Sequence, residues 1–343
     1  MNLQIIDPLT HPDYDKMVLA AGGSVFHTSS WARVLKNTYN YQPRYLVQIP
    51  DGKLTTLVPV MEVRSFLTGK RGVSLPFTDY CEPIVTNEQF WQDAMAYLLT
   101  FGGREKWDYL ELRGGSGLMG PAPCSSQYYR HQLALSGDID SIYTRLKSST
   151  RRNIKKAERE GVVVASENTQ ETLRMFYAMH CGTRKKHGVP PQPFSFFQQI
   201  FDNVIIPGHG RIMLARHQGK AVAAAIYLHF NDKAMYKYGA SDERYLHIRP
   251  NDLLMWEAIK WYCGKGYAEF CFGRTEQENE GLRQFKGGWG AEEETIRYYK
   301  YDFKQQAYVA GGNRLPGRYN KLFNIMPMPL LKISGSILHR HMG

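Results

Sequence analysis

The chain has 343 residues, a length that predicts two domains and allows a full hydrophobic core without disulfide or metal staples. Apolar residues make up 43% and charged residues 22% of the sequence, which excludes disorder of the whole chain. The net charge of +11 indicates an anionic partner: a nucleic acid, a phosphorylated molecule or an anionic lipid.

Targeting, membrane-spanning and cysteine signals are weak. The first ten residues lack the basic start and long apolar run of a signal peptide. The longest apolar run, residues 221–230, is interrupted by His229 and is far shorter than the ~18–20 residues that span a bilayer. The five cysteines include no CxxC pair, which indicates neither a disulfide framework nor a zinc site. We therefore expect a cytoplasmic protein with no metal and no resident cofactor.

The first half of the chain predicts a helix, three strands, a second helix and a fourth strand, over residues 29–35, 44–49, 54–60, 72–75, 88–99 and 107–113. Ser29 or Ser30 is the expected N-cap of the first helix. Asp51-Gly52 is a hairpin signal between the first two strands.

The second half repeats this order, with strands, a helix and a further strand predicted over residues 211–216, 221–230, 233–239, 252–264 and 268–274. Gly219-Lys220 lies between strands as Gly52-Lys53 does, and Gly266 is placed to end the helix. We infer duplicated domains. The alternative is that this order of elements is common among unrelated α+β proteins.

Between the halves, residues 141–161 predict a connecting helix with a cap at Ser149 or Thr150 and an end at Gly161. Residues 145–159 carry one acid, Glu158, and seven bases: Arg145, Lys147, Arg151, Arg152, Lys155, Lys156 and Arg159. Four of the bases recur every fourth residue and so share one side. This side is predicted to bind phosphates of tRNA or the diphosphate of a precursor. A solvated helix is the alternative.

Several motifs occur together in a fixed order. Residues 150–161 read TRRNIKKAEREG, residues 251–259 read NDLLMWEAI, and Phe272-Gly-Arg274 precedes GLRQFKGGWG at 281–290. With His27–Trp31 and Pro76–Pro83, these stretches resemble the Fem family of aminoacyltransferases over roughly residues 25–303. The chain is also similar to a Fem-related subgroup associated with exopolysaccharide and exosortase systems.

The resemblance implies an α+β fold with two tandem GNAT-like domains, at residues 1–140 on the acceptor side and 162–303 on the acyl-transfer side. The connecting helix at 141–161 lies between them, and a tail follows at 304–343. It further implies transfer of an aminoacyl group from aminoacyl-tRNA to an amine of a peptidoglycan stem peptide or an exopolysaccharide sugar. The helical-hairpin arm of some members is not expected, because residues 166–211 lack a sustained heptad pattern.

Acyl transfer to an amine requires a neutral amine, donors for the developing oxyanion and alignment of the two substrates. No Ser-His-Asp or G-x-S-x-G arrangement is present, so direct attack is expected. A CoA-dependent enzyme of this fold holds the pyrophosphate in a Gly-rich loop before a helix. Residues 244–252 contain no glycine, and Asp252 would repel a phosphate. This favours aminoacyl-tRNA over acyl-CoA, which remains the alternative donor.

Three residues are predicted to be catalytic. Lys286, beside Phe285 near the acyl-transfer channel that the resemblance implies, is expected to stabilise developing charge. Arg274 ends a strand, where sites are common, although an ion pair with Glu276 or Glu278 would also explain it. Asp79 lies in a proline-bounded loop and is predicted to accept the amine proton, with a turn-stabilising role as the alternative.

The remaining candidates are predicted to bind substrate: Phe285, Tyr238, Tyr236, Tyr80, Trp31, Lys36, Arg151, Arg152, Lys155 and Lys156. Tyr236 and Tyr238 alternate on a strand and are candidate oxyanion donors, with core packing as the alternative. Trp31 is better explained as a core residue than as a ligand contact. Lys36 is a candidate for a precursor phosphate, or simply an exposed helix lysine.

The tail at 304–343 contains no acid and alternates bases with apolar residues. This composition predicts peripheral association with an anionic membrane surface, with packing across the domains as the alternative. A third class of function, a non-catalytic scaffold that binds RNA or membranes, remains open because the proposed chemistry needs no nucleophile.

Overall fold

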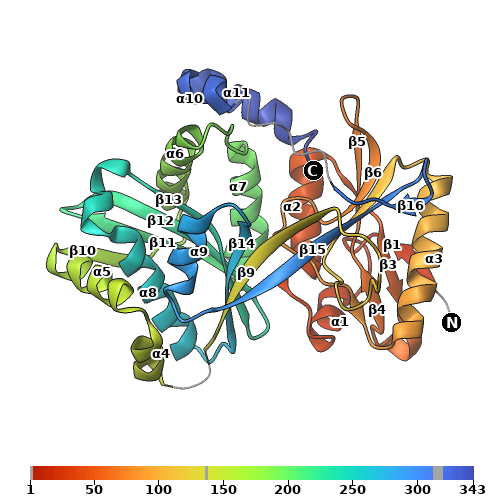
Figure 1. Cartoon of the computed structure of the whole chain (residues 1–343), viewed down its shortest axis with the longest axis horizontal. Helices are drawn as coiled ribbons and strands as arrows, with labels where there is room; N and C mark the ends of the chain where they lie inside the picture. The colour runs from red at the N-terminus through yellow and green to blue at the C-terminus, as the bar shows by residue number, and fades with distance from the viewer. Residues whose placement is uncertain (1–2, 136–137, 312–319) are drawn as a thin grey trace. The chain divides into compact units, whose positions relative to one another are not determined.

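The computed structural model describes residues 3–135, 138–311 and 320–343 (Figure 1). The chain divides into two compact units. The first unit comprises residues 1–128, 295–315 and 337–343, and the second comprises residues 129–294 and 316–336. The boundaries therefore fall inside two long strands, β9 (Ser126–Ala134) and β15 (Glu292–Asp302).

The first unit contains two groups of strands. In one, the order is β1 (Leu3–Ile6), β3 (Tyr45–Gln48), β4 (Thr56–Val58) and β7 (Ile84–Val85), all antiparallel. In the other, the order is β2 (Gln42–Pro43), β5 (Met61–Ser65), β6 (Gly69–Ser74), β8 (Tyr109–Arg113) and the end of β15, to which β16 (Ala307–Tyr308) pairs. The helices of this unit are α1 (Tyr14–Ala20), α2 (Ser29–Tyr39) and α3 (Glu88–Arg104).

The second unit is built on strands in the order β10 (Val162–Ser166), β11 (Gly210–His217), β12 (Lys220–Phe230), β13 (Lys233–Ser241), β14 (Glu269–Glu276) and β9. Its helices are α4 (Ile139–Arg145), α5 (Ser148–Arg159), α6 (Gln170–Lys186), α7 (Phe194–Ile200), α8 (Pro250–Gly264), α9 (Glu280–Gly287) and α10 (Asn320–Ile325). A last helix, α11 (Met328–His339), begins in this unit.

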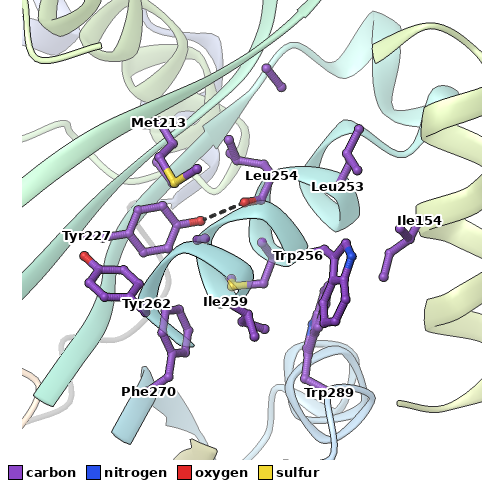
Figure 2. Close-up of a cluster of buried hydrophobic side chains, with 14 of the residues drawn as sticks. Ile154, Met213, Tyr227, Leu253, Leu254, Trp256, Ile259, Tyr262, Phe270 and Trp289 are labelled. Atoms are coloured by element: carbon purple, nitrogen blue, oxygen red, sulfur yellow. Dashed lines mark hydrogen bonds between the residues drawn. The ribbon is translucent and has the colours of Figure 1, made fainter. Parts of the chain in front are cut away.

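Helix α8 is the centre of the second unit's core (Figure 2). It is apolar on most of its faces because β11 and β12 cover one side while α5 packs on another. The hydroxyl of Tyr227 donates to the carbonyl oxygen of Leu254 at 3.4 Å, and Ile154 of α5 faces Leu253 and Trp256. This packing fixes α5, the helix that carries the basic residues, onto the unit.

The two units repeat the same order of elements, as the sequence predicted. In each unit an antiparallel pair of strands is followed by a helix and then by a strand parallel to the second strand of that pair. In the first unit the parallel pair is β6 and β8, joined through α3. In the second unit it is β13 and β14, joined through α8.

Local details differ from the sequence expectations. The cap of α2 is Thr28, whose Oγ1 accepts from the backbone N–H of Trp31 at 3.3 Å, rather than Ser29 or Ser30. Helix α5 begins at Ser148, before the expected cap, and Gly161 follows its end with a positive φ of 76°. The connecting helix is part of the second unit, because Ile154 and Ala157 are buried in that unit's core.

Candidate active site

The candidate site begins where β13 and β14 stop pairing. Their parallel register runs from Lys233 opposite Glu269 to Met235 opposite Cys271, yet the strands continue to Ser241 and Glu276. Beyond this point β13 also carries a bulge, since Tyr236 is opposite Tyr227 but Tyr238 is opposite Ile226, which leaves Lys237 as the extra residue. Beyond this point the N–H and C=O groups of β13 that face β14, and those of β14 that face β13, do not pair with each other, so they can hydrogen-bond to other groups or to a ligand.

Lys286 belongs to α9, and its ammonium contacts the part of β14 that lies beyond the last pair with β13. Its side chain is buried, with 3% of the residue exposed, and its Nζ donates to the carbonyl oxygens of Gly273 at 2.9 Å and Arg274 at 3.0 Å. Gly273 has a φ of +73°, a conformation that glycine adopts without strain. A buried ammonium is stable only when it is hydrogen-bonded, and these two carbonyls accept the hydrogen bonds that it needs. The structure thus places the cation against the β14 backbone just past the last paired residue.

Arg274 and Phe285 lie next to Lys286 in the chain or in space. The guanidinium of Arg274 is partly exposed and lies 3.4 Å from the Glu276 carboxylate, the ion pair that the sequence offered as the structural alternative. Phe285 is half-buried and packs edge-on against Trp289, with ring centroids 6.0 Å apart. Arg274 thus meets Lys286 through its backbone carbonyl, and Phe285 precedes Lys286 in α9.

The two tyrosines of β13 have different surroundings. Burial raises the pKa of Tyr236 to about 12, so its hydroxyl stays protonated at neutral pH. A Cβ at Gly239 would lie 1.6 Å from that hydroxyl, so only glycine leaves room for it. In the described part of the chain, the Tyr236 hydroxyl makes no hydrogen bond. Tyr238 instead packs edge-on against Phe197 at 5.2 Å, as a core residue would.

A buried histidine close to Lys286, His131, was not among the residues predicted from the sequence. His131 of β9 is 1% exposed, and its Nε2 lies 3.1 Å from the Glu293 carboxylate, which also pairs with Arg283 at 2.7 Å. Burial, followed by the charge of Lys286, lowers the pKa of His131, so the ring is neutral at neutral pH. Within the described residues, its Nδ1 has no hydrogen-bond partner. Only pairing between strands distant in sequence brings these groups together, so no local motif signals them.

The candidates of the first unit lie in different settings. Trp31 is fully buried and packs against Phe26 at 5.0 Å, so it serves as a core residue. Lys36 pairs with Asp7 at 3.1 Å. Asp79 and Tyr80 are partly exposed, and the backbone carbonyl of Asp79 accepts a short hydrogen bond from the Tyr298 hydroxyl. That bond fixes the loop while the Asp79 side chain keeps access to solvent.

The predicted connecting helix is divided into α4 and α5, so the seven basic residues are divided too: Arg145 ends α4, Lys147 is the N-cap of α5, and the other five belong to α5. Arg145, Lys147, Arg152, Lys155 and Arg159 are exposed, and Arg151 and Lys156 are partly exposed. Across the residues that the structure describes, none of the seven pairs with a carboxylate. Asn153 of α5 donates to Asp252 at 3.2 Å, and burial raises the pKa of Asp252. The N-terminus of α8, where a nucleotide phosphate would bind in a Gly-rich loop, is thus covered by α5 and a buried carboxyl group.

Residues 144–293 match the model of the acetyltransferase (GNAT) domain. This part of the chain therefore has the fold of a GNAT domain. Its match includes α5, the diverging strands β13 and β14, and Lys286, so the expected fold is confirmed for the second unit. Among the described residues, no helix is long and apolar enough to cross a membrane, and no three or more His, Cys, Asp or Glu side chains group together so that they could hold a metal ion.

The Fem resemblance is confirmed by a relative of known activity. The chain is 27% identical over 135 residues to the UDP-N-acetylmuramoylpentapeptide-lysine N(6)-alanyltransferase of Weissella viridescens. The match covers 38% of this chain and 39% of that enzyme, so the chain spans well under half of the relative's length.

Solved structures confirm the tandem fold. The crystal structure of FemX superposes with a TM-score of 0.68 at 14% identity, covering 87% of this chain and 97% of FemX. A tandem GNAT protein from the clavulanic acid biosynthesis pathway superposes with a TM-score of 0.57 at 10% identity, covering 88% and 98%. The chain therefore has the two-domain GNAT architecture over most of its length, in addition to the GNAT domain of its second unit.

Proposed function

We propose that the chain is an acyltransferase that moves an aminoacyl group onto an amine of a cell-envelope precursor. The acceptor would be a peptidoglycan stem peptide or an exopolysaccharide sugar. The observation that carries the proposal is the buried Lys286 ammonium at the divergence of β13 and β14, inside the part of the chain that matches the GNAT domain. The similarity of part of the chain to an alanyltransferase supports it.

The proposed reaction is direct attack of a neutral amine on the donor ester. The amine nitrogen bonds to the ester carbonyl carbon, the bond to the tRNA ribose oxygen breaks, and the amine proton passes to that leaving oxygen. The Tyr236 hydroxyl is the proposed donor to the oxyanion, and the charge of Lys286 favours negative charge developing beside β14. No covalent enzyme intermediate is required.

Aminoacyl-tRNA is the proposed donor, held by the unpaired cations of α5. Acyl-CoA is the second candidate, because the matching family model is an acetyltransferase domain. The covered N-terminus of α8 and the glycine-free segment before it argue against CoA. Calorimetry with CoA and with aminoacyl-tRNA separates the two donors.

We further propose that the protein works in the cytoplasm, at the inner face of the membrane. Helices α10 and α11 expose Leu322, Ile325, Leu330 and Ile333, and no acid follows Asp302. Such helices suit an anionic lipid surface. Other parts of the tail are packed: Leu331 is buried, and Lys332 lies over the ring of Tyr177 at 5.4 Å.

Mass spectrometry of envelope precursors from cells with and without the protein tests the proposal. The expected result is a precursor whose mass rises by one aminoacyl residue only when the protein is present. Identical precursor masses would reject it and would favour a non-catalytic scaffold that binds RNA or membrane.

A further inference from the structure

The turn between β5 and β6 exposes two large apolar side chains. Phe66 is 86% exposed and Leu67 is 57% exposed, the former being the most exposed large apolar residue among those described. The hairpin projects from the first unit, and the turn lies at its tip (Figure 1). Exposure of such residues to water is unfavourable unless a partner covers them, so an exposed apolar tip indicates a docking surface.

The end of the chain is held beside this tip. The ring of His341 lies edge-on to Phe66 with centroids 4.6 Å apart, and the Thr68 hydroxyl donates to the His341 carbonyl at 2.9 Å. Arg71, which is buried, donates to the same carbonyl at 2.8 Å and to that of Gly343 at 2.7 Å. These bonds fix Met342, which is 48% exposed, in the same region of the first unit.

Helix α11 leads into this segment with a second apolar face. Leu331, Gly335 and His339 are buried at intervals of four residues. Leu330, Ile333 and Ile337 occupy the opposite, exposed side at a spacing of three and four residues. The buried side holds α11 against the protein, and the exposed side leaves three large apolar side chains uncovered.

The charges around the tip indicate what that partner is. Residues 63–78 contain no acid, nor does any residue after Asp302. The Arg64 side chain is 63% exposed although it pairs with the buried Glu62, and Arg340 is exposed. Lys70, at the base of the hairpin, is neutralised by Glu62 and Glu105. Two exposed arginines in acid-free stretches of the sequence, together with exposed apolar side chains, fit a bilayer with anionic headgroups.

We propose that the β5–β6 tip and the C-terminal segment, residues 337–343, form a membrane-docking surface that inserts Phe66 and Leu67 into an anionic bilayer. This deepens the peripheral association proposed above, and rests on it, by naming the inserting residues. An aromatic ring and a leucine enter the acyl boundary, while Arg64 and Arg340 meet the lipid phosphates.

Vesicle sedimentation of the full chain tests the proposal. The probes are vesicles of equal parts phosphatidylglycerol and phosphatidylcholine, and vesicles of phosphatidylcholine alone. The wild type is expected to bind the anionic vesicles, and Phe66→Ser with Leu67→Ser to bind them at least about tenfold more weakly. The matched control is Leu19→Ser with Ile206→Ser, two other exposed apolar residues, which is expected to bind like wild type.

Three results would overturn the docking surface: equal vesicle binding by wild type and the Phe66/Leu67 variant, binding of neutral vesicles as strong as that of anionic ones, or a vesicle-free dimer that this variant dissociates. The last would make a second copy the occupant. Acyl transfer to a water-soluble precursor is measured on the same variant and is expected to be unchanged. Absent transfer by wild type with intact vesicle binding would reject only the proposed reaction.

Discussion

The ammonium of Lys286 lies 2.9 Å from the carbonyl oxygen of Gly273, a residue that β14 places just beyond its last pair with β13. One cation therefore both completes the hydrogen bonding of a strand that has diverged from its neighbour and supplies positive charge beside that strand. The structural role of Lys286 and its proposed catalytic role concern the same ammonium group, so each must be measured separately.

Replacing Lys286 with methionine keeps the length of the side chain and removes both hydrogen bonds. We expect the free energy of unfolding to fall by about 1–3 kcal/mol, because two buried carbonyls lose their donor. Turnover is expected to fall about tenfold or more with little change in the acceptor KM. Chemical denaturation and steady-state kinetics check the two effects, with the exposed Lys304→Met as control. Unchanged turnover would remove Lys286 from the mechanism.

Replacing Tyr236 with phenylalanine tests the proposed oxyanion donor. The ring remains, while the hydroxyl above Gly239 is removed, so we expect kcat to fall about 10- to 100-fold with little change in stability. Tyr238→Phe is the matched control on the same strand, because the Tyr238 ring packs against Phe197. Equal losses in both variants would contradict a specific role of the Tyr236 hydroxyl.

Reversing two exposed charges on α5 tests the phosphate-binding face. Arg152→Glu with Lys155→Glu is expected to weaken tRNA binding about tenfold or more. The slope of log affinity against log salt is negative, and its magnitude should fall by roughly one for each phosphate that the helix no longer neutralises. The control, Lys304→Glu with Lys321→Glu, makes the same change in net charge elsewhere. If both variants bind tRNA equally weakly, net charge rather than α5 determines binding.

The stability of the second unit should fall in acid because of a buried histidine. His229 donates to the Gly208 carbonyl at 2.8 Å and contacts the Tyr262 hydroxyl at 2.9 Å, and burial lowers its pKa to about 4. In the unfolded chain His229 binds a proton near pH 6.5, whereas in the folded chain it binds one only near pH 4. The neutral, buried His229 therefore contributes fully to the free energy of unfolding above pH 6.5. This contribution is lost on acidification and falls by about 3 kcal/mol at pH 4.

Urea unfolding at pH 7 and pH 5 measures this dependence. His229→Gln is expected to flatten the pH profile between those values, although it lowers stability at pH 7. Replacing the partly exposed His11 should leave the profile unchanged. An unaltered pH dependence in the His229 variant would assign the acid sensitivity to other groups, such as His131.

Much of the fold followed from local pattern. The hairpin at Asp51-Gly52, the strands from 211 to 239 and the helix before Gly266 are confirmed, because turn residues and apolar periodicity act over short distances. The strand β9 and the His131–Glu293 pair were not predicted, since they depend on pairing between distant segments. The burial of Lys286 was also not predicted, because a lysine between aromatic and glycine neighbours carries no signal of its carbonyl partners.

Domain limits were the other difference. The sequence predicts boundaries near 140 and 303, whereas the compact units divide within β9 and β15, so strands rather than linkers cross between units. The tail predicted at 304–343 is shared between the units, and the part of it at 312–319 lies outside the described residues. Composition shifts identify a tail but not the unit against which its residues pack.

The most direct measurement is mass spectrometry of UDP-N-acetylmuramoyl-pentapeptide incubated with the purified protein and aminoacyl-tRNA. We expect wild type to form a product that is heavier by one aminoacyl residue on the acceptor amine, and Lys286→Met to form much less of it. An unmodified acceptor with aminoacyl-tRNA, together with an acylated amine when acyl-CoA is supplied, would contradict the proposed reaction.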